Sequence, residues 1–173
     1  MIRYFISFFI LLVFYSESSL AAQVQTLLNY SMKLSIETSA SKEKIWQLWA
    51  KVDEWKTYDE RLKYSFLIDG ASFETGAQGY IKGKGAPKTK FKLIEVVENK
   101  SFIEVLYLPL GQTIHLHRYF EPSADGKTIF THEVRFKGGL KSVFHLFLNG
   151  PFKKDLKLVM AKMKELAEQT STK

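Results

Sequence analysis

Side chains that could carry chemistry gather in two alternating stretches of the second half of the chain. His115, His117 and Tyr119 occupy every second position of the first stretch, and His132 lies within the second. An imidazole near its ordinary pKa gives or accepts a proton at little cost, so His117 and His132 are candidates for a general acid and base. The same groups could instead bind the polar head of a small molecule. Alternatively, they are structural and are satisfied by Tyr119, by backbone or by water.

The two stretches are joined by Ala124-Asp125-Gly126, which predicts a β-hairpin because Asp-Gly between apolar runs is a strong turn signal. A connecting loop of even length would point the histidines inward and leave a charged set, which includes Arg118, on the solvent side. We call the predicted inner set the histidine face. It consists of His115, His117, Tyr119 and Glu121 from one strand and of Phe130, His132, Val134 and Phe136 from the other.

Patterns typical of metals and cofactors are weak or missing in the sequence. Three histidines could hold zinc on geometric grounds, but no carboxylate partner or outer hydrogen-bonding group is legible beside them, so we expect no metal. The glycine-rich segment 76–85 precedes no helix and fits no nucleotide motif. The sequence contains no nucleophile elbow and no dinucleotide fingerprint. We therefore expect no cofactor.

The elements that must position these residues follow from hydrophobic periodicity. The alternation in residues 28–38 predicts a strand, and the spacing of Ile45, Trp46 and Trp49 after Ser41 predicts a helix. A short helical segment follows at residues 53–61. Six alternating runs separated by turn residues then predict an antiparallel meander. The runs span residues 62–68, 78–84, 88–97, 101–108, 112–121 and 127–137.

A long amphipathic helix is predicted over residues 140–168. We expect a break at Asn149-Gly150-Pro151, because proline cannot continue the helical hydrogen-bond ladder. Beyond the break an apolar stripe requires a sheet to cover it. The complete order predicts an α+β fold, β-α-α-β6-α, in which a curved seven-stranded antiparallel sheet wraps around the C-terminal helix and leaves a pocket. The stripe residues expected to line the pocket are Phe152, Leu156, Val159 and Met163.

The N-terminus has the pattern of a secretory signal. Arg3 precedes an apolar run over residues 4–15, and polar residues then lead to Leu-Ala-Ala at 20–22. We therefore expect a signal peptide over 1–22, one mature domain over 23–173 and a periplasmic or secreted location. The run is shorter than the roughly 20 residues of a spanning helix, although retention as an anchor stays the alternative. The chain has no cysteine, so the fold must rest on packing without disulfides.

The chain carries a formal net charge of +7, which favours anionic partners. Lysines alternate along a predicted hairpin with its tip at Gly85-Ala86-Pro87, and this lysine ladder either contacts an anionic membrane or forms a solvated edge. The apolar loop over 106–111 is either a gate in contact with lipid or a buried turn. Nucleic acid is not an expected partner of an exported protein. The lysine ladder consists of Lys82, Lys84, Lys88, Lys90 and Lys92.

Three stretches resemble the START-like (SRPBCC) superfamily and, within it, the polyketide cyclase/dehydrase branch. Residues 39–46, Ser-Ala-Ser-Lys-Glu-Lys-Ile-Trp, are similar to the start of the family's first helix. Residues 52–58 resemble its Trp-Pro-x-Trp element, from which Lys56 and Tyr58 depart. Residues 130–168, from Phe-Thr-His-Glu-Val-Arg-Phe to Leu-Ala-Glu, resemble its final strand and helix.

The resemblance implies the helix-grip fold and a hydrophobic ligand. Members of the superfamily carry lipids, sterols, polyketides or quinones, and some catalyse cyclisation or dehydration, so fold alone does not separate carrier from enzyme. The favoured hypothesis is an exported carrier or sensor that binds a lipid-like molecule whose polar part meets the histidine face. One alternative is a cyclase- or dehydratase-like enzyme that uses His117 or His132 as acid and base. Another is an interaction module whose interior is filled by side chains.

Overall fold

The structure, a computed structural model, describes residues 31–123 and 125–169 of the 173-residue chain. The predicted signal peptide over 1–22 and the start of the predicted first strand lie outside the described residues. None of the described helices combines the length and the apolar character that crossing a membrane requires.

Seven antiparallel strands form one sheet in the order β1-β7-β6-β5-β4-β3-β2. The strands are β1 (Ser31–Thr38), β2 (Leu62–Leu67), β3 (Gln78–Gly83), β4 (Lys88–Val97), β5 (Ser101–Tyr107), β6 (Thr113–Glu121) and β7 (Thr128–Lys137). From β2 to β7 each strand pairs with the next along the chain, as the alternating runs and turn signals predicted. β1 instead pairs with β7, so the first strand is held by the last.

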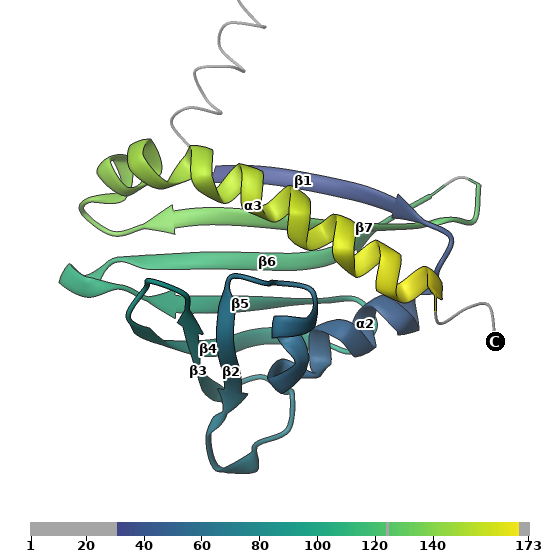
Figure 1. Cartoon of the computed structure of the whole chain (residues 1–173), viewed down its shortest axis with the longest axis horizontal. Coiled ribbons are helices and arrows are strands. Elements are labelled where there is room, and N and C mark those ends of the chain that lie inside the picture. Colours follow the sequence, from purple (N-terminus) through teal and green to yellow (C-terminus); the bar gives the residue numbers. More distant parts are fainter. Residues whose placement is uncertain (1–30, 124, 170–173) are drawn as a thin grey trace, which may run out of the picture.

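Helices cover one face of this sheet (Figure 1). They are α2 (Lys42–Ala50), the 3-10 helix η1 (Val52–Thr57) and α3 (Lys141–Gln169), with single 3-10 turns η2 (Ile68–Gly70) and η3 (Pro109–Gly111) in the connections. α3 crosses β1 and β7, and its C-terminal end lies beside α2. The order of elements confirms the predicted α+β helix-grip architecture.

The core between sheet and helices is rich in aromatic rings at the end where α2 packs. Trp49 is fully buried, and its ring centroid lies 4.9 to 6.4 Å from those of Phe102, Phe120 and Phe130. Tilted and edge-to-face pairs of this kind each contribute about 0.5–1.5 kcal/mol beyond the burial of area. Met160 of α3 is also fully buried. We call this end, around Trp49, the closed end of the grip.

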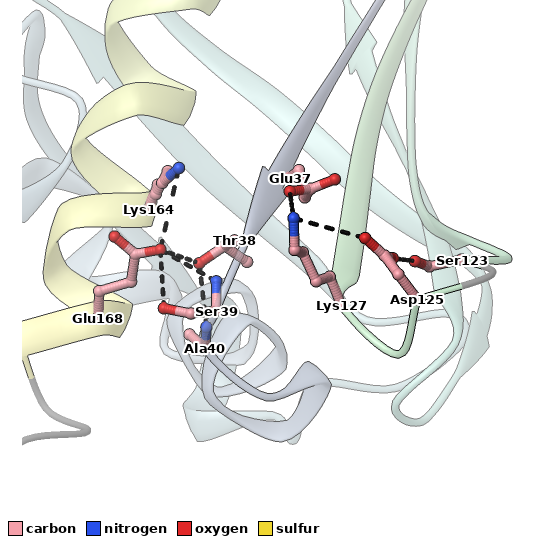
Figure 2. A network of polar contacts seen from close by, with 9 residues as sticks. All are labelled: Glu37, Thr38, Ser39, Ala40, Ser123, Asp125, Lys127, Lys164 and Glu168. Atoms are coloured by element: carbon pink, nitrogen blue, oxygen red, sulfur yellow. Dashed lines mark hydrogen bonds and ion pairs between the residues drawn. The ribbon is translucent and has the colours of Figure 1, made fainter.

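A carboxylate network joins the end of β1 to the end of α3 (Figure 2). Glu168 Oε1 accepts hydrogen bonds from the Thr38 hydroxyl at 2.9 Å and from the backbone N–H and hydroxyl of Ser39 at 3.0 and 3.1 Å. The backbone N–H of Ala40 in turn donates to Thr38 Oγ1 at 3.1 Å. The start of α2 is therefore fixed by a side chain from the far end of the chain, whereas Ser41 makes no side-chain capping bond.

The predicted break at Asn149-Gly150-Pro151 is wrong, because α3 continues through Pro151. Proline costs a helix about 3 kcal/mol by removing one hydrogen bond and crowding the carbonyl one turn earlier. That carbonyl belongs to Phe147, and both Phe147 and Pro151 are exposed, so water can take the lost bond. Leu148 and Phe152 pack against the core before and after the proline. Their partial burial holds both halves of the helix on the sheet and contributes part of the roughly 1.5–3 kcal/mol that complete burial of each side chain would give.

The pairing of β6 with β7 corrects the predicted histidine face. Glu121 pairs with Ile129, so an odd number of residues, 122–128, separates the two partners, and even-numbered residues of the two strands share a face. A shift of one residue exchanges the two faces of a strand. The inner face is instead made by Ile114, Leu116, Arg118 and Phe120 of β6 with Phe130, His132, Val134 and Phe136 of β7. His115, His117, Tyr119 and Glu121 lie on the outer face.

Candidate functional site

Two opposite charges on neighbouring strands meet inside the grip. Arg118 of β6 and Glu104 of β5 occupy inner-face positions of the sheet, opposite His132 and Leu116 respectively. Arg118 Nη1 donates to Glu104 Oε2 at 2.8 Å, and the two side chains are only 11% and 1% exposed. A salt bridge this deep gains little net stability, because the desolvation of each ion costs several kcal/mol.

Aromatic rings contact the guanidinium group of Arg118. The Arg118 guanidinium carbon lies 5.2 Å from the ring centroid of Trp55 and 5.1 Å from that of Phe102. Desolvated cation–π contacts of this kind contribute about 2 kcal/mol. Trp55 is itself fixed, because its indole N–H donates to the backbone carbonyl of Trp49 at 2.9 Å. η1 therefore positions the cation on the sheet.

Glu104 retains an unused hydrogen-bond acceptor. Its Oε1 atom is buried and has no hydrogen-bond partner among the described residues. Burial raises the pKa of the Glu104 carboxyl, and the charge and hydrogen bond of Arg118 oppose that rise. A buried polar atom without a partner costs about 1–3 kcal/mol, so its presence in the interior calls for an explanation.

A cavity of about 310 Å³ adjoins this pair between the sheet and α3. Most of its wall is apolar, and Glu104 and Arg118 supply charge on the sheet side. Its size is at the lower end of the range for small-molecule sites, about 300–1,000 Å³. The lining residues are Trp55, Tyr58, Asp59, Arg61, Leu62, Ile81, Gly83, Lys84, Ala86, Glu104, Leu106, Leu116, Arg118, Phe152 and Val159.

An ion-pair bridge connects the cavity wall after η1 with α3. Arg61 forms a salt bridge with Asp59 at 2.7 Å and also pairs with Asp155 of α3. The neighbouring Tyr58 hydroxyl donates to the Leu48 carbonyl at 3.3 Å, and burial raises the pKa of Tyr58. Tyr58 therefore stays a neutral phenol at the cavity wall. Two larger hollows beside α2 and α3 are lined mainly by exposed or partly exposed side chains and are surface grooves.

The structure separates the histidines that the sequence grouped together. His132 is buried and accepts a hydrogen bond on Nε2 from the Trp49 indole at 3.2 Å. Burial, and to a smaller extent the charge of Arg118, lower the pKa of His132 well below its ordinary value, so the imidazole is neutral. His115 and His117 are half-buried on the outer face, where burial likewise lowers their pKa values. None of the three lines the cavity.

The predicted wall residues divide between cavity and packed core. Phe152 and Val159 of α3 line the cavity. Tyr119 lies outside, with its ring centroid 4.6 Å from that of His117. In the described part of the chain, no three His, Cys, Asp or Glu side chains cluster closely enough to hold a metal ion. The predicted wall residues that are buried in the core without lining the cavity are Phe130, Val134, Phe136, Leu156 and Met163.

Sequence reasoning missed Glu104 and Arg118, although a signal was present. Ile114, Leu116 and Phe120 alternate, and Arg118 occupies the position where the next apolar residue is due. Glu104 interrupts the alternation of β5 in the same way. Opposite charges at core positions of two consecutive predicted strands indicate a buried pair, because neither charge is tolerated there alone.

The lysine ladder follows the β3–β4 hairpin. Lys82 pairs with Lys88 across the hairpin, and Lys84 lies at its tip and lines the cavity. The Lys88 ammonium lies 3.8 Å from the ring centroid of Tyr80. Lys90 and Lys92 continue along the outer face of β4. Contact of this ladder with a membrane stays a prediction.

Comparison with known proteins adds information about the fold. No protein-family model matches the sequence, and no curated protein matches it. A START superfamily protein from Mycobacterium smegmatis has a TM-score of 0.62 at 12% identity, over 81% of this chain and 98% of that one. The Zhui aromatase/cyclase from Streptomyces sp. R1128 has a TM-score of 0.65 at 8% identity, over 80% of this chain and 93% of that one.

A two-domain protein has the same fold in one part. The di-domain ARO/CYC StfQ from the steffimycin biosynthetic pathway has a TM-score of 0.65 at 10% identity, over 82% of this chain and 51% of that one. Together with the sheet order and the position of α3, these similarities define a START-like helix-grip fold. This confirms the fold that the sequence resemblance implied.

Proposed function

We propose that this protein binds one small amphipathic molecule in the cavity between the sheet and α3. The polar part of the molecule lies at Glu104 and Arg118, and its apolar part lies along Leu106, Leu116 and Phe152. One observation carries the proposal: a buried charge pair, in which Glu104 Oε1 has no hydrogen-bond partner among the described residues, adjoins a cavity whose wall is mainly apolar. Apolar residues of similar volume are often as stable or more stable at such positions, so stability alone does not account for the pair.

The unused acceptor indicates which head group fits. Glu104 Oε1 can accept a hydrogen bond from a hydroxyl or an amide, and Arg118 can donate to an oxygen of the same head. A neutral head with both a donor and an acceptor satisfies the pair without adding a third charge to the interior. The START-like fold supports this carrier function by analogy alone.

Native mass spectrometry of the purified protein tests the proposal. We expect one small molecule per chain, which is lost in Leu116→Trp because the larger side chain fills the cavity. Ile103→Trp adds the same side chain to the outer face of β5, where Ile103 lies opposite His117, and should keep the molecule. Wild-type protein free of any bound molecule, or equal occupancy in the two variants, would contradict the proposal.

The role of the head group has its own test. Glu104→Gln keeps the shape of the side chain but removes its charge and one acceptor. We expect roughly tenfold weaker binding of the molecule that co-purifies with the protein, as the loss of one charge-assisted hydrogen bond implies. Unchanged affinity in a folded Glu104→Gln protein would remove Glu104 from the site.

A cyclase- or dehydratase-like enzyme is the second candidate function. It is favoured by Glu104, because a buried carboxyl with a raised pKa in an apolar cavity is suited to act as a general acid. His117 and His132 are not suited to this role, since one lies on the outer face and the other is buried away from the cavity. Incubating the extracted molecule with fresh protein and with Glu104→Gln separates the two functions. Glu104-dependent loss of water or ring closure, detected by mass, indicates an enzyme, and recovery of the unchanged molecule indicates a carrier.

The proposal includes export. Its support is the charged, apolar and small-residue order of residues 1–22 in the sequence. We expect the protein in a periplasmic or culture fraction, with an intact mass that begins near residue 23. Full-length protein in the membrane fraction would instead favour the anchor alternative.

A further inference from the structure

Five apolar side chains stand exposed on η3, at the residue before α3 and on the first turns of α3. Leu110, Leu146 and Phe147 are 77%, 75% and 70% exposed, and Leu140 and Val143 are 40% and 46% exposed. The connection from β5 to β6, which contains η3, and the N-terminal turns of α3 lie at the same end of the sheet in Figure 1. We call these five residues the apolar rim.

A buried amide holds the two parts of the apolar rim together. Gln112 Nε2 donates to the Leu110 carbonyl at 2.9 Å, and Gln112 Oε1 accepts from the Leu140 N–H at 2.9 Å. Leu110 has a φ of 60°, in the left-handed region that residues with a side chain rarely adopt. A buried side chain therefore maintains a strained leucine that points an apolar group to solvent. Strain of this kind is concentrated at functional sites.

The two segments that carry the apolar rim contain basic residues but no acidic residue. Residues 134–154 contain no Asp or Glu, and residues 105–114 contain no charged residue. The next acidic side chain along α3 is Asp155, which is paired with Arg61. We call the basic side chains of residues 134–154 the basic border, and one of them, Arg135, is paired with Glu133. The basic residues within 134–154 are Arg135, Lys137, Lys141, Lys153 and Lys154.

We infer that the apolar rim docks on the surface of an anionic phospholipid bilayer. Leu110, Leu146 and Phe147 enter the interface between headgroups and acyl chains, and the basic border faces the headgroups. The charge pattern favours a bilayer over a second copy of the chain, because a symmetric dimer would bring the same positive charges face to face. Docking is independent of the proposed cavity ligand. It brings η3 and the start of α3, which adjoin the cavity residues Leu106 and Phe152, against the lipid.

The absence of cysteine makes a site-specific test possible on the full chain. An environment-sensitive dye is attached at Ser142→Cys, beside the apolar rim, or at Ala161→Cys, an exposed position on the later half of α3. The probe is a vesicle of phosphatidylcholine with roughly one-third phosphatidylglycerol, an anionic composition. We expect a blue shift and protection from an aqueous quencher at position 142 and neither change at 161. Pure phosphatidylcholine vesicles should give a response at least several-fold weaker.

Two pairs of substitutions in the Ser142→Cys protein assign the response to the rim. Leu146→Ser with Phe147→Ser should abolish the blue shift, and Lys153→Glu with Lys154→Glu should weaken vesicle binding about tenfold or more. Lys90→Glu with Lys92→Glu makes the same change of charge on the lysine ladder and should have a much smaller effect. Equal responses of the dye at positions 142 and 161 would overturn docking through the rim. So would a larger effect of the two substitutions in the lysine ladder than of those at Lys153 and Lys154, or a dye at position 142 that is already shielded without vesicles. Shielding without vesicles would identify a second copy or the apolar N-terminal segment as the occupant.

Discussion

The two ends of the grip use the same sheet and the same helix but differ in how they are filled. At the closed end, Trp49 and Phe102 are buried in ring contact with each other. At the other end, Leu106 and Phe152 line a cavity of about 310 Å³, and the apolar rim is exposed nearby. Along β5 the inner side chains change from Phe102 to Glu104 to Leu106, from a large ring to a charge to an aliphatic group. One end is therefore filled by buried rings, and the other contains the cavity in which we propose that the small molecule binds.

The largest expected effect is at the closed end. Trp49→Ala should destabilise the fold by about 3–5 kcal/mol, because it removes a buried indole, several ring contacts and the hydrogen bond to His132. Equilibrium unfolding in urea measures the loss. A change below about 1 kcal/mol would show that this end does not carry the stability of the fold.

Removal of Arg118 should rank next. Arg118→Met keeps an apolar stem but leaves Glu104 buried without a cation, at an expected cost of about 3 kcal/mol at neutral pH. Burial raises the pKa of Glu104 above the ordinary 4.5, so the variant should recover stability as the pH falls and lose it as the pH rises through the raised pKa. The double variant Glu104→Gln with Arg118→Met should unfold with a much weaker dependence on pH. A single variant that is equally stable from acid to neutral pH would contradict the assigned role of the pair.

The pH dependence contributed by His132 should be smaller. Its pKa is lowered in the folded state, so its contribution to stability is complete above the ordinary pKa of 6.5 and is lost as the pH falls below that value. The loss has a limiting slope of about 1.4 kcal/mol per pH unit. His132→Gln can still accept the Trp49 hydrogen bond and should remove this slope. Urea unfolding between pH 7 and pH 5 compares the two proteins, and parallel pH profiles would argue against a buried neutral imidazole.

The smallest effect should come from the cavity wall. Leu116→Ala enlarges a space that already exists and should cost about 1–2 kcal/mol, below the usual range of about 2–5 kcal/mol, because Leu116 is only partly buried. Leu93→Ala makes the same change at a fully buried position that does not line the cavity and should cost about 3 kcal/mol or more. Equal costs for the two variants would mean that the cavity wall at Leu116 is packed as densely as the core around Leu93.

The order of elements was predictable because it depends on local patterns. Alternation marked each strand of the meander, and the spacing of Ile45, Trp46 and Trp49 marked α2. The stripe through Phe152 and Val159 marked the face of α3 that turns to the sheet. These signals lie within a few residues of the structure that they specify. The pairing of β1 with β7 was not among the predictions, because no local pattern indicates it.

The site was not predictable from the same patterns, because it depends on register. An odd number of residues, 122–128, separates Glu121 from its partner Ile129, whereas the prediction assumed an even number. This difference of one residue places His117 on the outer face and Arg118 in the interior. Greater weight on Ile114, Leu116 and Phe120 would have given the correct face. The orphaned oxygen of Glu104 and the cavity volume need coordinates, since both depend on how side chains from distant strands fill space. The continuity of α3 through Pro151 similarly depends on packing that a local rule does not include.

The pairing of β1 with β7 also sets the order of events during synthesis. β1 is made early, but its only strand partner in the described sheet lies about a hundred residues further on, at Thr128–Lys137. A nascent chain that ends before this strand leaves β1 without a ladder and α3 absent, so stable folding must wait until nearly the whole polypeptide has emerged. Such non-local pairing also slows folding. We expect the chain to reach its stable fold only after most of its last third has been translated, a delay that would suit the export proposed above.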